Sequence, residues 1–435
     1  MSWAYHPALL ARPVPRYTSY PTAADFHEGV GEAELATALG AIAPDQPVSL
    51  YLHIPFCDRI CWYCGCNTAA ANKVDRLAAC LAAIHSEIDL VADRLPARLS
   101  ISQIAFGGGS PNVISGAQFT ALIDHLNNRF ATSGATLSVE VDPRSLAEDF
   151  VAAMANAKVQ RASLGVQTFS DAIQRRIGRV QPLAQISRAV AMLRAAGISS
   201  LNFDLMYGLP GQTMADLQAT LAQAVAQGPE RIALFGYAHV PHLIPRQRRI
   251  DATALPGAEL RFDMAAAGYE YLVEAGYQPV GFDHFALPGD PLAKATRDGT
   301  LRRNFQGFTD DQARNLIGFG PSAISSFPDL LVQNAKNSGQ HRLLTGAGRL
   351  PAERGLVRTA EDQRRGRIVE SLLCASEART GALPDALAPF AAQGLIAYDG
   401  SRLSLLPGAL PYARSIAATF DGRLADKSQR FSAAV

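Results

Sequence analysis

The sequence has no long hydrophobic run, almost no excess of charge and few cysteines. It contains no stretch of about 18 consecutive apolar residues, so no transmembrane helix is expected. Forty basic and 39 acidic side chains leave a formal charge of +1, which argues against a general nucleic-acid-binding or membrane-binding surface. The N-terminal segment lacks the basic and apolar regions of a signal peptide, so we expect a cytoplasmic protein.

The cysteines are unevenly distributed. Four of the six fall within HIPFCDRICWYCGCNT (53–68), at positions 57, 61, 64 and 66. In a cytosolic chain such a group indicates metal binding or catalysis rather than a disulfide framework. Zinc sites usually combine two separate cysteine pairs, and no second pair is present here. Cys80 and Cys374 lie in helical patterns and are expected to be buried as small apolar residues.

The spacing of the first three thiols, Cys57, Cys61 and Cys64, suits an iron–sulfur cube. Three thiolates bind three irons and leave the fourth iron open to a ligand that is not part of the chain. Cys66 follows Cys64 by only two residues. It could compete for the fourth iron, or it could lie beside the cluster or on the substrate side. The spacing favours a role other than that of a ligand.

Strand-like and helix-like segments alternate through the first half of the chain. The alternation predicts an α/β fold with a parallel sheet and right-handed crossovers. Six units are too few for a closed eight-unit barrel, so we expect an open, curved (β/α)6 partial barrel. The expected strands are 48–54, 101–108, 137–142, 161–169, 200–208 and 231–239. The expected helices between them are 74–94, 116–130, 146–157, 183–196 and 213–227.

Polar and glycine residues occur where these strands end. Ligands bind at the carboxyl edge of parallel α/β sheets, so these residues mark the expected site. Three regions are expected: an N-terminal arm (1–45), a catalytic domain (46–330) and a C-terminal cap domain (331–435). The cap should be mostly helical and winged-helix-like, with a hairpin turning at Asp399-Gly400. The residues at the strand ends are 107–110, Glu140, Gln167, Asp204, Ala238 and His239.

CDRICWYC, following the first strand, resembles the C-x3-C-x2-C loop of radical S-adenosylmethionine enzymes, and FGGGSP resembles their glycine-rich turn. Further segments make the chain similar to the oxygen-independent coproporphyrinogen III oxidases. Besides the CGC ending of the loop, they include RPVPRYTSYPTAADF (12–26), YLHIPFC (51–57), VEVDPR (139–144), GVQTF (165–169), DLMYGLPGQT (204–213), FDHFA (282–286) and RRNFQGFT (302–309).

This resemblance implies oxidative decarboxylation of two propionate side chains to vinyl groups, giving protoporphyrinogen IX for haem synthesis. A propionate β-carbon is too weakly acidic for any side-chain base, which is consistent with hydrogen-atom abstraction by a 5′-deoxyadenosyl radical. The implied cofactors are a 4Fe–4S cluster and two molecules of S-adenosylmethionine. An electron donor and an electron acceptor are also implied, and the sequence names neither. We expect a monomer that binds neither nucleic acid nor membranes.

The resemblance also implies roles for individual residues. Cys57, Cys61 and Cys64 would ligate the cluster. The first S-adenosylmethionine would be held by Tyr51, Gly108, Glu140, Ala238 and Ile324. The second would be held by Tyr63, Gly109, Ser110, Gln167, Arg179 and Asp204. Arg179 and Asp204 are expected to offer opposite charges to a zwitterionic methionine end. The positions associated with activity are Tyr51, His53, Cys66, Glu140, Phe305, Gln306 and Ile324.

Some alternatives remain at this point. A core-packed histidine is a second interpretation of His53. The candidates for contacts with the substrate propionates are Arg16, Tyr17, Tyr20, Arg303, Phe305 and Gln306. A haem chaperone of the same fold, or another porphyrin-acting radical enzyme, would share the cysteine loop. The CGC ending and the PRYTSYPT arm favour the oxidase.

Overall fold

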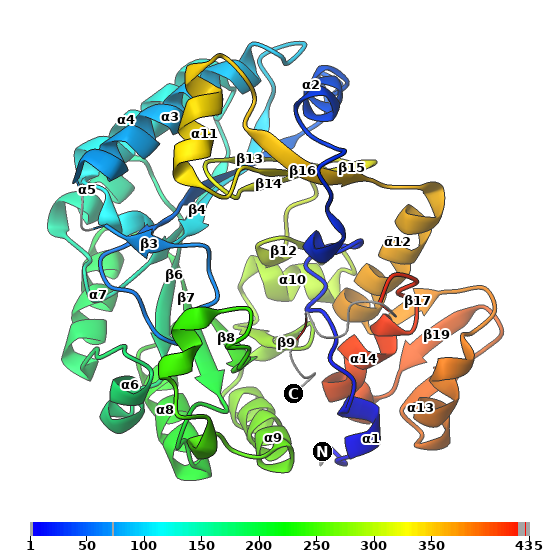
Figure 1. Ribbon diagram of the computed structural model, residues 1–435. Helices are drawn as coiled ribbons and strands as arrows, with labels where there is room; N and C mark the ends of the chain where they lie inside the picture. Colours follow the sequence, from blue (N-terminus) through cyan, green and yellow to red (C-terminus); the bar gives the residue numbers. More distant parts are fainter. Residues whose placement is uncertain (1–2, 72–73, 425–430, 432–435) are drawn as a thin grey trace.

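The computed structural model describes residues 3–71, 74–424 and 431. One large curved sheet organises the molecule, and its outer face is covered by helices (Figure 1). Six parallel strands lie side by side in chain order, so the expected (β/α)6 partial barrel is confirmed. These strands are β1 (Val48–Ile54), β4 (Ile101–Gly108), β5 (Thr136–Val141), β6 (Arg161–Gln167), β7 (Ser200–Tyr207) and β8 (Arg231–Gly236).

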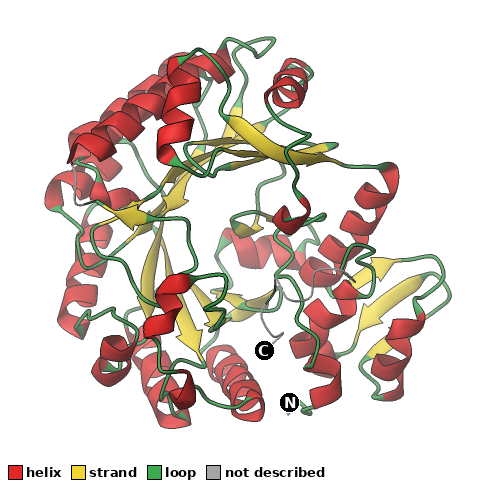
Figure 2. Ribbon diagram, in the orientation of Figure 1, coloured by secondary structure: helices red, strands yellow, loops and turns green. Residues whose placement is uncertain are grey.

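Amphipathic helices connect these strands across the outer face (Figure 2). Helix α4 (Gly116–Arg129) is an example of a helix whose first turn is capped by a side chain. The Ser115 hydroxyl, at its N-terminus, accepts a hydrogen bond from the Gln118 amide at 3.2 Å. Leu122 and Leu126 on its inner face are completely buried. The outer helices are α3 (Val74–Ala92), α4 (Gly116–Arg129), α5 (Glu148–Asn156), α6 (Asp171–Arg176), α7 (Leu183–Ala195), α8 (Met214–Ala226) and α9 (Ala258–Glu274).

The sheet extends beyond the six expected strands at both edges. Strand β13 (Asn315–Phe319) pairs parallel to β1, and three antiparallel strands follow it: β14 (Ile324–Ser326), β15 (Leu330–Asn334) and β16 (Ala352–Val357). At the other edge, β10 (His284–Ala286) pairs antiparallel to β8, and β9 (Gln278–Val280) pairs antiparallel to β10. Short strands joined by hairpins do not produce the strand–helix alternation on which the expectation rested. The expected boundary at residue 330 therefore coincides with the start of a strand of the main sheet.

The N-terminal arm joins the two parts of the molecule. Its helix α2 (Glu32–Gly40) lies against β15 and β16, whereas α1 (Pro7–Leu10) packs with the C-terminal helices. The Tyr412 hydroxyl donates to the Ala4 carbonyl at 2.6 Å and accepts from the His6 amide at 2.8 Å. The arm therefore connects the edge of the sheet to the C-terminal unit.

The C-terminal unit has the expected helices and hairpin, and a third strand joins the hairpin to form a small sheet (Figure 2). The turn at Asp399 and Gly400 is present, with Gly400 at φ 96°. After this hairpin the chain forms a 3-10 helix, Pro407–Tyr412, which contains Pro411, and then α14. The elements of this unit are α12 (Ala360–Ala375), β17 (Glu377–Arg379), α13 (Ala388–Ala392), β18 (Ile396–Tyr398), β19 (Arg402–Leu405) and α14 (Ala413–Ala418).

Smaller elements complete the chain: β2 (Phe56–Cys57), β3 (Ala69–Ala70), α10 (Pro291–Arg297), the hairpin of β11 (Arg302–Asn304) and β12 (Gly307–Thr309), and α11 (Ser338–Gly346). Among the described residues, no helix is both long and apolar enough to cross a bilayer.

A buried polar network attaches the antiparallel edge of the sheet to the outer helices. Glu87 on α3 is 1% exposed and accepts from the Gly320 amide at 2.7 Å, from Asn334 at 2.6 Å and from His341 Nε2 at 2.8 Å. Gly320 follows β13, Asn334 ends β15 and His341 lies on α11, so a single carboxylate holds three segments together. Removing it would leave several buried donors without a partner.

We therefore expect Glu87→Ala to destabilise the fold by about 3–5 kcal/mol. The matched control is Glu148→Ala, because the Glu148 side chain is 81% exposed and its ion pair with Arg188 lies on the surface. Urea unfolding followed by circular dichroism gives the comparison. Equal unfolding midpoints for the two variants would show that the network does not stabilise the sheet.

Candidate active site

An open cavity of about 1400 Å³ lies at the carboxyl ends of the parallel strands. This position agrees with the general location of ligand sites in parallel α/β sheets. Most of the expected site residues line it, although they come from seven separate chain segments. These residues are Cys57, Cys61, Tyr63, Cys64, Cys66, Gly108, Gly109, Ser110, Glu140, Gln167, Arg179, Asp204 and Ala238.

The other expected residues do not line this cavity. Tyr51 and His53 lie on β1, where His53 is 8% exposed. Ile324 begins β14 and packs near Phe305, in an apolar cluster that also contains Phe26. Phe305 lines a separate polar cavity below the N-terminal arm. Gln306 is exposed in the turn between β11 and β12.

The glycine-rich turn after β4 lies directly against the start of the cysteine loop. The Gly109 amide donates to the Ile54 carbonyl at 2.9 Å, and the Ser110 amide donates to the Phe56 carbonyl at 2.8 Å. A Cβ atom at Gly109 would lie 2.3 Å from the Phe56 carbonyl oxygen. Only glycine permits this approach, which places the turn beside Cys57.

Backbone pairing closes the cysteine loop at its two ends. Strands β2 and β3 are parallel, with Cys57 opposite Ala70. The Cys57 sulfur lies 3.2 Å from the Thr68 hydroxyl and 3.5 Å from the Ser110 hydroxyl. The loop is therefore anchored on both sides of its thiols, and two hydroxyl groups surround the first sulfur.

Two arginines contact the sulfur of Cys61. Arg144 Nη2 lies 3.4 Å and Arg179 Nη1 3.3 Å from it. Both guanidinium groups also bind Asp142, at 2.6 Å and 3.2 Å respectively. Although burial opposes ionisation, Arg179 and Arg144 hold the pKa of Asp142 below its usual value. This arrangement leaves a net positive charge beside Cys61, which suits an anionic cluster.

Cys64 and Cys66 interact with each other. The Cys66 amide donates to the Cys64 sulfur at 3.4 Å. Hydrogen bonding from Cys66 lowers the pKa of Cys64 to about 6, and the same interaction raises the pKa of Cys66. Cys64 is therefore the preferred thiolate of this pair, which agrees with its expected role as a ligand.

Glu140 approaches the glycine turn from β5. Its carboxylate accepts from the Gly108 amide at 3.2 Å, and a Cβ atom at Gly107 would lie 2.5 Å from its Oε1 atom. The side chain is open to the cavity but surrounded by protein. Displacement of bulk water, reinforced by nearby Asp204, raises the pKa of Glu140 to about 7. The group can therefore gain or lose a proton near neutral pH.

His53 lies behind the glycine turn as a neutral imidazole. Burial lowers its pKa to about 4. Its Nε2 lies 3.3 Å from the Asn67 carbonyl, and its Nδ1 lies 3.2 Å from the Tyr51 hydroxyl. A carbonyl can only accept, so Nε2 carries the proton and Nδ1 accepts from Tyr51. His53 thus links β1 to the residue that follows Cys66.

The far wall of the cavity is formed by β6, β7 and β8. Gln167 ends β6 at φ 67°, a left-handed conformation that costs about 1–3 kcal/mol in a residue other than glycine. Asp204 accepts from Ser163 at 3.1 Å and from Asn202 at 2.8 Å, and burial raises its pKa. Arg179 instead binds Asp142 and the Gly165 carbonyl. The two charges are thus held separately on this wall.

Several structural partners in the site were not singled out from the sequence. Asp142 and Arg144 belong to the VEVDPR segment, but no property of that segment alone shows that they reach Cys61. Gln247 is buried and donates to the carbonyls of both Tyr63 and Ala238, at 2.8 and 3.0 Å. It lies far along the chain from the loop that it supports, so no local spacing could have indicated it.

The residues present fit an iron–sulfur cluster better than a single metal ion. Among the described residues, no three histidine, cysteine, aspartate or glutamate side chains converge closely enough to hold one ion. A cube separates its thiolate ligands by its own edges, and three cysteines facing one cavity suit that larger group. The arginines beside Cys61 supply charge of the correct sign.

Comparisons with known proteins agree with this geometry. Residues 51–224 match the model of the Radical SAM superfamily. The chain is 42% identical over 437 residues to an oxygen-independent coproporphyrinogen III oxidase of Bradyrhizobium diazoefficiens, covering 97% of both chains. It is 35% identical to the enzyme of that name from Escherichia coli, covering 96% of this chain and 95% of the relative.

A solved structure gives the same result. The coproporphyrinogen III oxidase of Escherichia coli, described as a radical SAM enzyme, superposes with a TM-score of 0.89 at 34% identity. The match covers 97% of this chain and 100% of the other, so it includes the N-terminal arm and the C-terminal unit. The chain therefore belongs to the oxygen-independent coproporphyrinogen III oxidase family within the radical S-adenosylmethionine enzymes.

Proposed function

We propose that this chain converts coproporphyrinogen III to protoporphyrinogen IX by oxidative decarboxylation of two propionates. The observation that carries the proposal is the convergence of three thiols, a glycine turn and acidic strand ends on one cavity, in a chain that matches such oxidases along its whole length. Membership of the family implies a 4Fe–4S cluster and S-adenosylmethionine. Together these groups supply the carbon-centred radical that can abstract hydrogen from an unactivated carbon.

The cluster would be held by Cys57, Cys61 and Cys64. Arg144 and Arg179 stabilise negative charge on the Cys61 side of this group, and Thr68 and Ser110 surround the Cys57 sulfur. Cys66 remains beside the ligand set, in contact with Cys64. Its role would be on the substrate side, because a fourth thiolate would occupy the position that the methionine end of the cofactor requires.

One S-adenosylmethionine would lie between the glycine turn and the end of β8. Gly108, with φ 104° and no side chain, allows its backbone to approach the methionine group. The Glu140 carboxylate can accept hydrogen bonds from the amine or the ribose hydroxyls, and Ala238 offers backbone groups opposite it. Tyr51 and Ile324 would act from outside the cavity, because neither residue lines it.

A second S-adenosylmethionine is also part of the proposal. The residues proposed for it line the same cavity as the cysteine loop. Tyr63, Gly109, Ser110, Gln167, Arg179 and Asp204 all face this space. Arg179 and Asp204 are held apart by separate partners, so they can meet the carboxylate and the amine of one methionine end. His53, Phe305 and Gln306 would support the site from outside the cavity.

Anaerobic turnover is the direct test of this function. The reconstituted protein is supplied with coproporphyrinogen III, S-adenosylmethionine and a low-potential reductant, and products are identified by mass spectrometry. We expect loss of two molecules of carbon dioxide per porphyrinogen. Cluster-loaded protein that binds porphyrin without changing it would contradict the proposal and favour a carrier of the same fold. A physiological electron donor and acceptor remain to be identified.

We expect Cys64→Ser and Cys66→Ser to differ in iron content. The Cys64 variant loses a proposed ligand and should fail to retain the cluster, whereas the Cys66 variant should retain four irons per chain and lose at least tenfold in turnover. Iron analysis after anaerobic reconstitution gives the comparison, with Cys80→Ser as the control because Cys80 is buried on α3. Equal loss of iron in the Cys64 and Cys66 variants would make Cys66 a ligand.

Binding of S-adenosylmethionine should depend on pH through Glu140. Because the pKa of this carboxyl is about 7, the group is mostly protonated at pH 6 and mostly ionised at pH 8. The ionised carboxylate only accepts hydrogen bonds, whereas the protonated form also carries an O–H donor. The affinity for S-adenosylmethionine should therefore rise about tenfold from pH 6 to pH 8. Equilibrium dialysis should show weaker and pH-independent binding in Glu140→Gln. A pH profile in that variant identical to the wild type would remove Glu140 from the cofactor site.

A further inference from the structure

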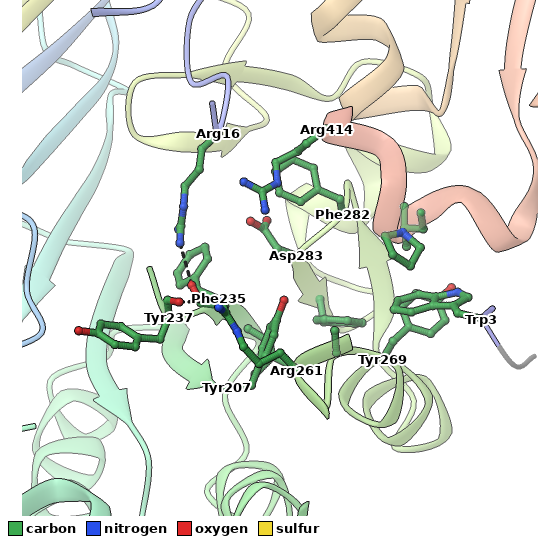
Figure 3. Close-up of a pocket in the computed structure, with 16 residues that line it drawn as sticks. Trp3, Arg16, Tyr207, Phe235, Tyr237, Arg261, Tyr269, Phe282, Asp283 and Arg414 are labelled. Atoms are coloured by element: carbon green, nitrogen blue, oxygen red, sulfur yellow. Dashed lines mark hydrogen bonds between the residues drawn. The ribbon is translucent and has the colours of Figure 1, made fainter. Parts of the chain in front are cut away.

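A second cavity, whose lining side chains are drawn in Figure 3, shares part of its wall with the active-site cavity. Its walls come from the N-terminal arm, from the ends of β7 and β8, from α9 and from the C-terminal unit. Arg16, Phe235 and Tyr237 line both cavities and form the partition between them. A ligand that is longer than one cavity could therefore reach from the cysteine loop into this second space.

Three arginines from distant segments enter this cavity. Arg16 belongs to the arm, Arg261 to α9 and Arg414 to α14, and Figure 3 shows their side chains around Asp283. Arg16 Nη2 donates to the Gly236 carbonyl at 3.0 Å, and Arg261 Nη2 donates to the Tyr237 carbonyl at 2.7 Å. These carbonyls lie immediately before Ala238, so the arginines are attached to the edge of the active site.

The charges in this cavity do not balance. Among the described residues that line it, Asp283 is the one acid, and its Oδ1 atom already lies 2.6 Å from Nδ1 of His284. Three guanidinium groups, those of Arg16, Arg261 and Arg414, line the same cavity as this carboxylate. Burial, together with repulsion from Arg16, lowers the pKa of Arg414 to about 10. The buried Nε atom of Arg261 has no hydrogen-bond partner within the described structure. A buried guanidinium nitrogen without a partner favours an incoming acceptor such as a carboxylate.

Aromatic rings limit the positions that these cations can adopt. The Arg16 guanidinium lies 5.4 Å from the centre of the Phe235 ring, and that of Arg414 lies 5.8 Å from Phe282. Trp3 and Tyr269 form an apolar wall on the other side (Figure 3). The cavity thus combines preorganised guanidinium groups with apolar surface, which suits a carboxylate on a short hydrocarbon arm.

We propose that Arg16, Arg261 and Arg414 bind one propionate carboxylate of the tetrapyrrole while another propionate undergoes reaction in the adjoining cavity. This inference rests on the proposed function and adds a substrate-binding site to it. Binding at a distance from the reacting carbon would orient the ring, because a tetrapyrrole held by one arm has fewer ways to present the others. The arm and the C-terminal unit thereby become part of substrate recognition.

The methionine carboxylate of a cofactor has the same chemistry, and the test separates the two sources. The probes are coproporphyrin III, the stable oxidised tetracarboxylate, and its tetramethyl ester, added to cluster-loaded protein under anaerobic conditions. Fluorescence quenching gives porphyrin affinity, and equilibrium dialysis gives S-adenosylmethionine affinity. The variants are Arg16→Gln, Arg261→Gln and Arg414→Gln. Arg188→Gln is the control, because Arg188 is 71% exposed on α7.

We expect each of the three variants to bind the tetracarboxylate about tenfold more weakly, as the loss of one charge-assisted contact implies. The ester should bind weakly to all proteins alike, and S-adenosylmethionine affinity should stay unchanged. Turnover should show a raised KM for coproporphyrinogen III, and Arg261→Lys and Arg414→Lys should recover part of the affinity. Arg16 lies on the exposed arm, so its variant remains informative if the buried substitutions disturb folding.

Unchanged tetracarboxylate affinity in Arg16→Gln and in the folded buried variants would overturn the inference. Loss of S-adenosylmethionine affinity with unchanged porphyrin affinity would overturn it as well, and would assign the cavity to the cofactor. Both results are distinct from failure of the proposed function, in which the wild-type protein would not convert coproporphyrinogen III at all. Iron content and circular dichroism identify the variants that have folded.

Discussion

The close contact between the glycine turn after β4 and the backbone of β2 is the constraint on which the site depends. Gly109 lies so near the Phe56 carbonyl that no side chain fits between them, and its amide continues the pairing of β4 with β1 through the Ile54 carbonyl. Cys57 immediately follows Phe56. The position of the first thiol is therefore determined by a backbone contact between neighbouring strands, and the cysteine loop extends from it over the carboxyl edge of the sheet.

Charge is arranged around this frame in two separate groups. Next to the loop, Asp142 holds Arg144 and Arg179 against the Cys61 sulfur, where their positive charge suits the proposed cluster. Across the partition, Arg16 and Arg414 share Asp283 as their nearby acid. The first group is nearly neutralised by its own carboxylate and by the thiolates. The second retains positive charge, which is why it is suited to an anionic ligand. Neither group can be recognised from the total charge of the chain, which is nearly balanced.

The sequence predicted the parallel half of the fold well because its strands and helices alternate. It also predicted the residues at the strand ends, since parallel strands bring their carboxyl ends to one edge. It did not predict β9, β10 or β13–β16, which are short strands outside the regular strand–helix alternation. The partners of Arg179, and the meeting of Arg16, Arg261 and Arg414, depend on chain segments far apart in sequence. No local pattern in the sequence indicates such contacts. For the same reason, the sequence did not show that Phe305 and Gln306 lie outside the cavity.

The central claim is that backbone contact at Gly109 positions the cluster ligands, and Gly109→Ala tests it most directly. Its control is Gly346→Ala, at the end of α11, where a Cβ atom meets no other atom within 4 Å. Iron content and porphyrinogen turnover are measured after anaerobic reconstitution, with circular dichroism to confirm folding. We expect a folded Gly109→Ala protein with depleted iron and at least tenfold lower turnover, beside a control that resembles the wild type. Full iron content and normal turnover in Gly109→Ala would contradict it.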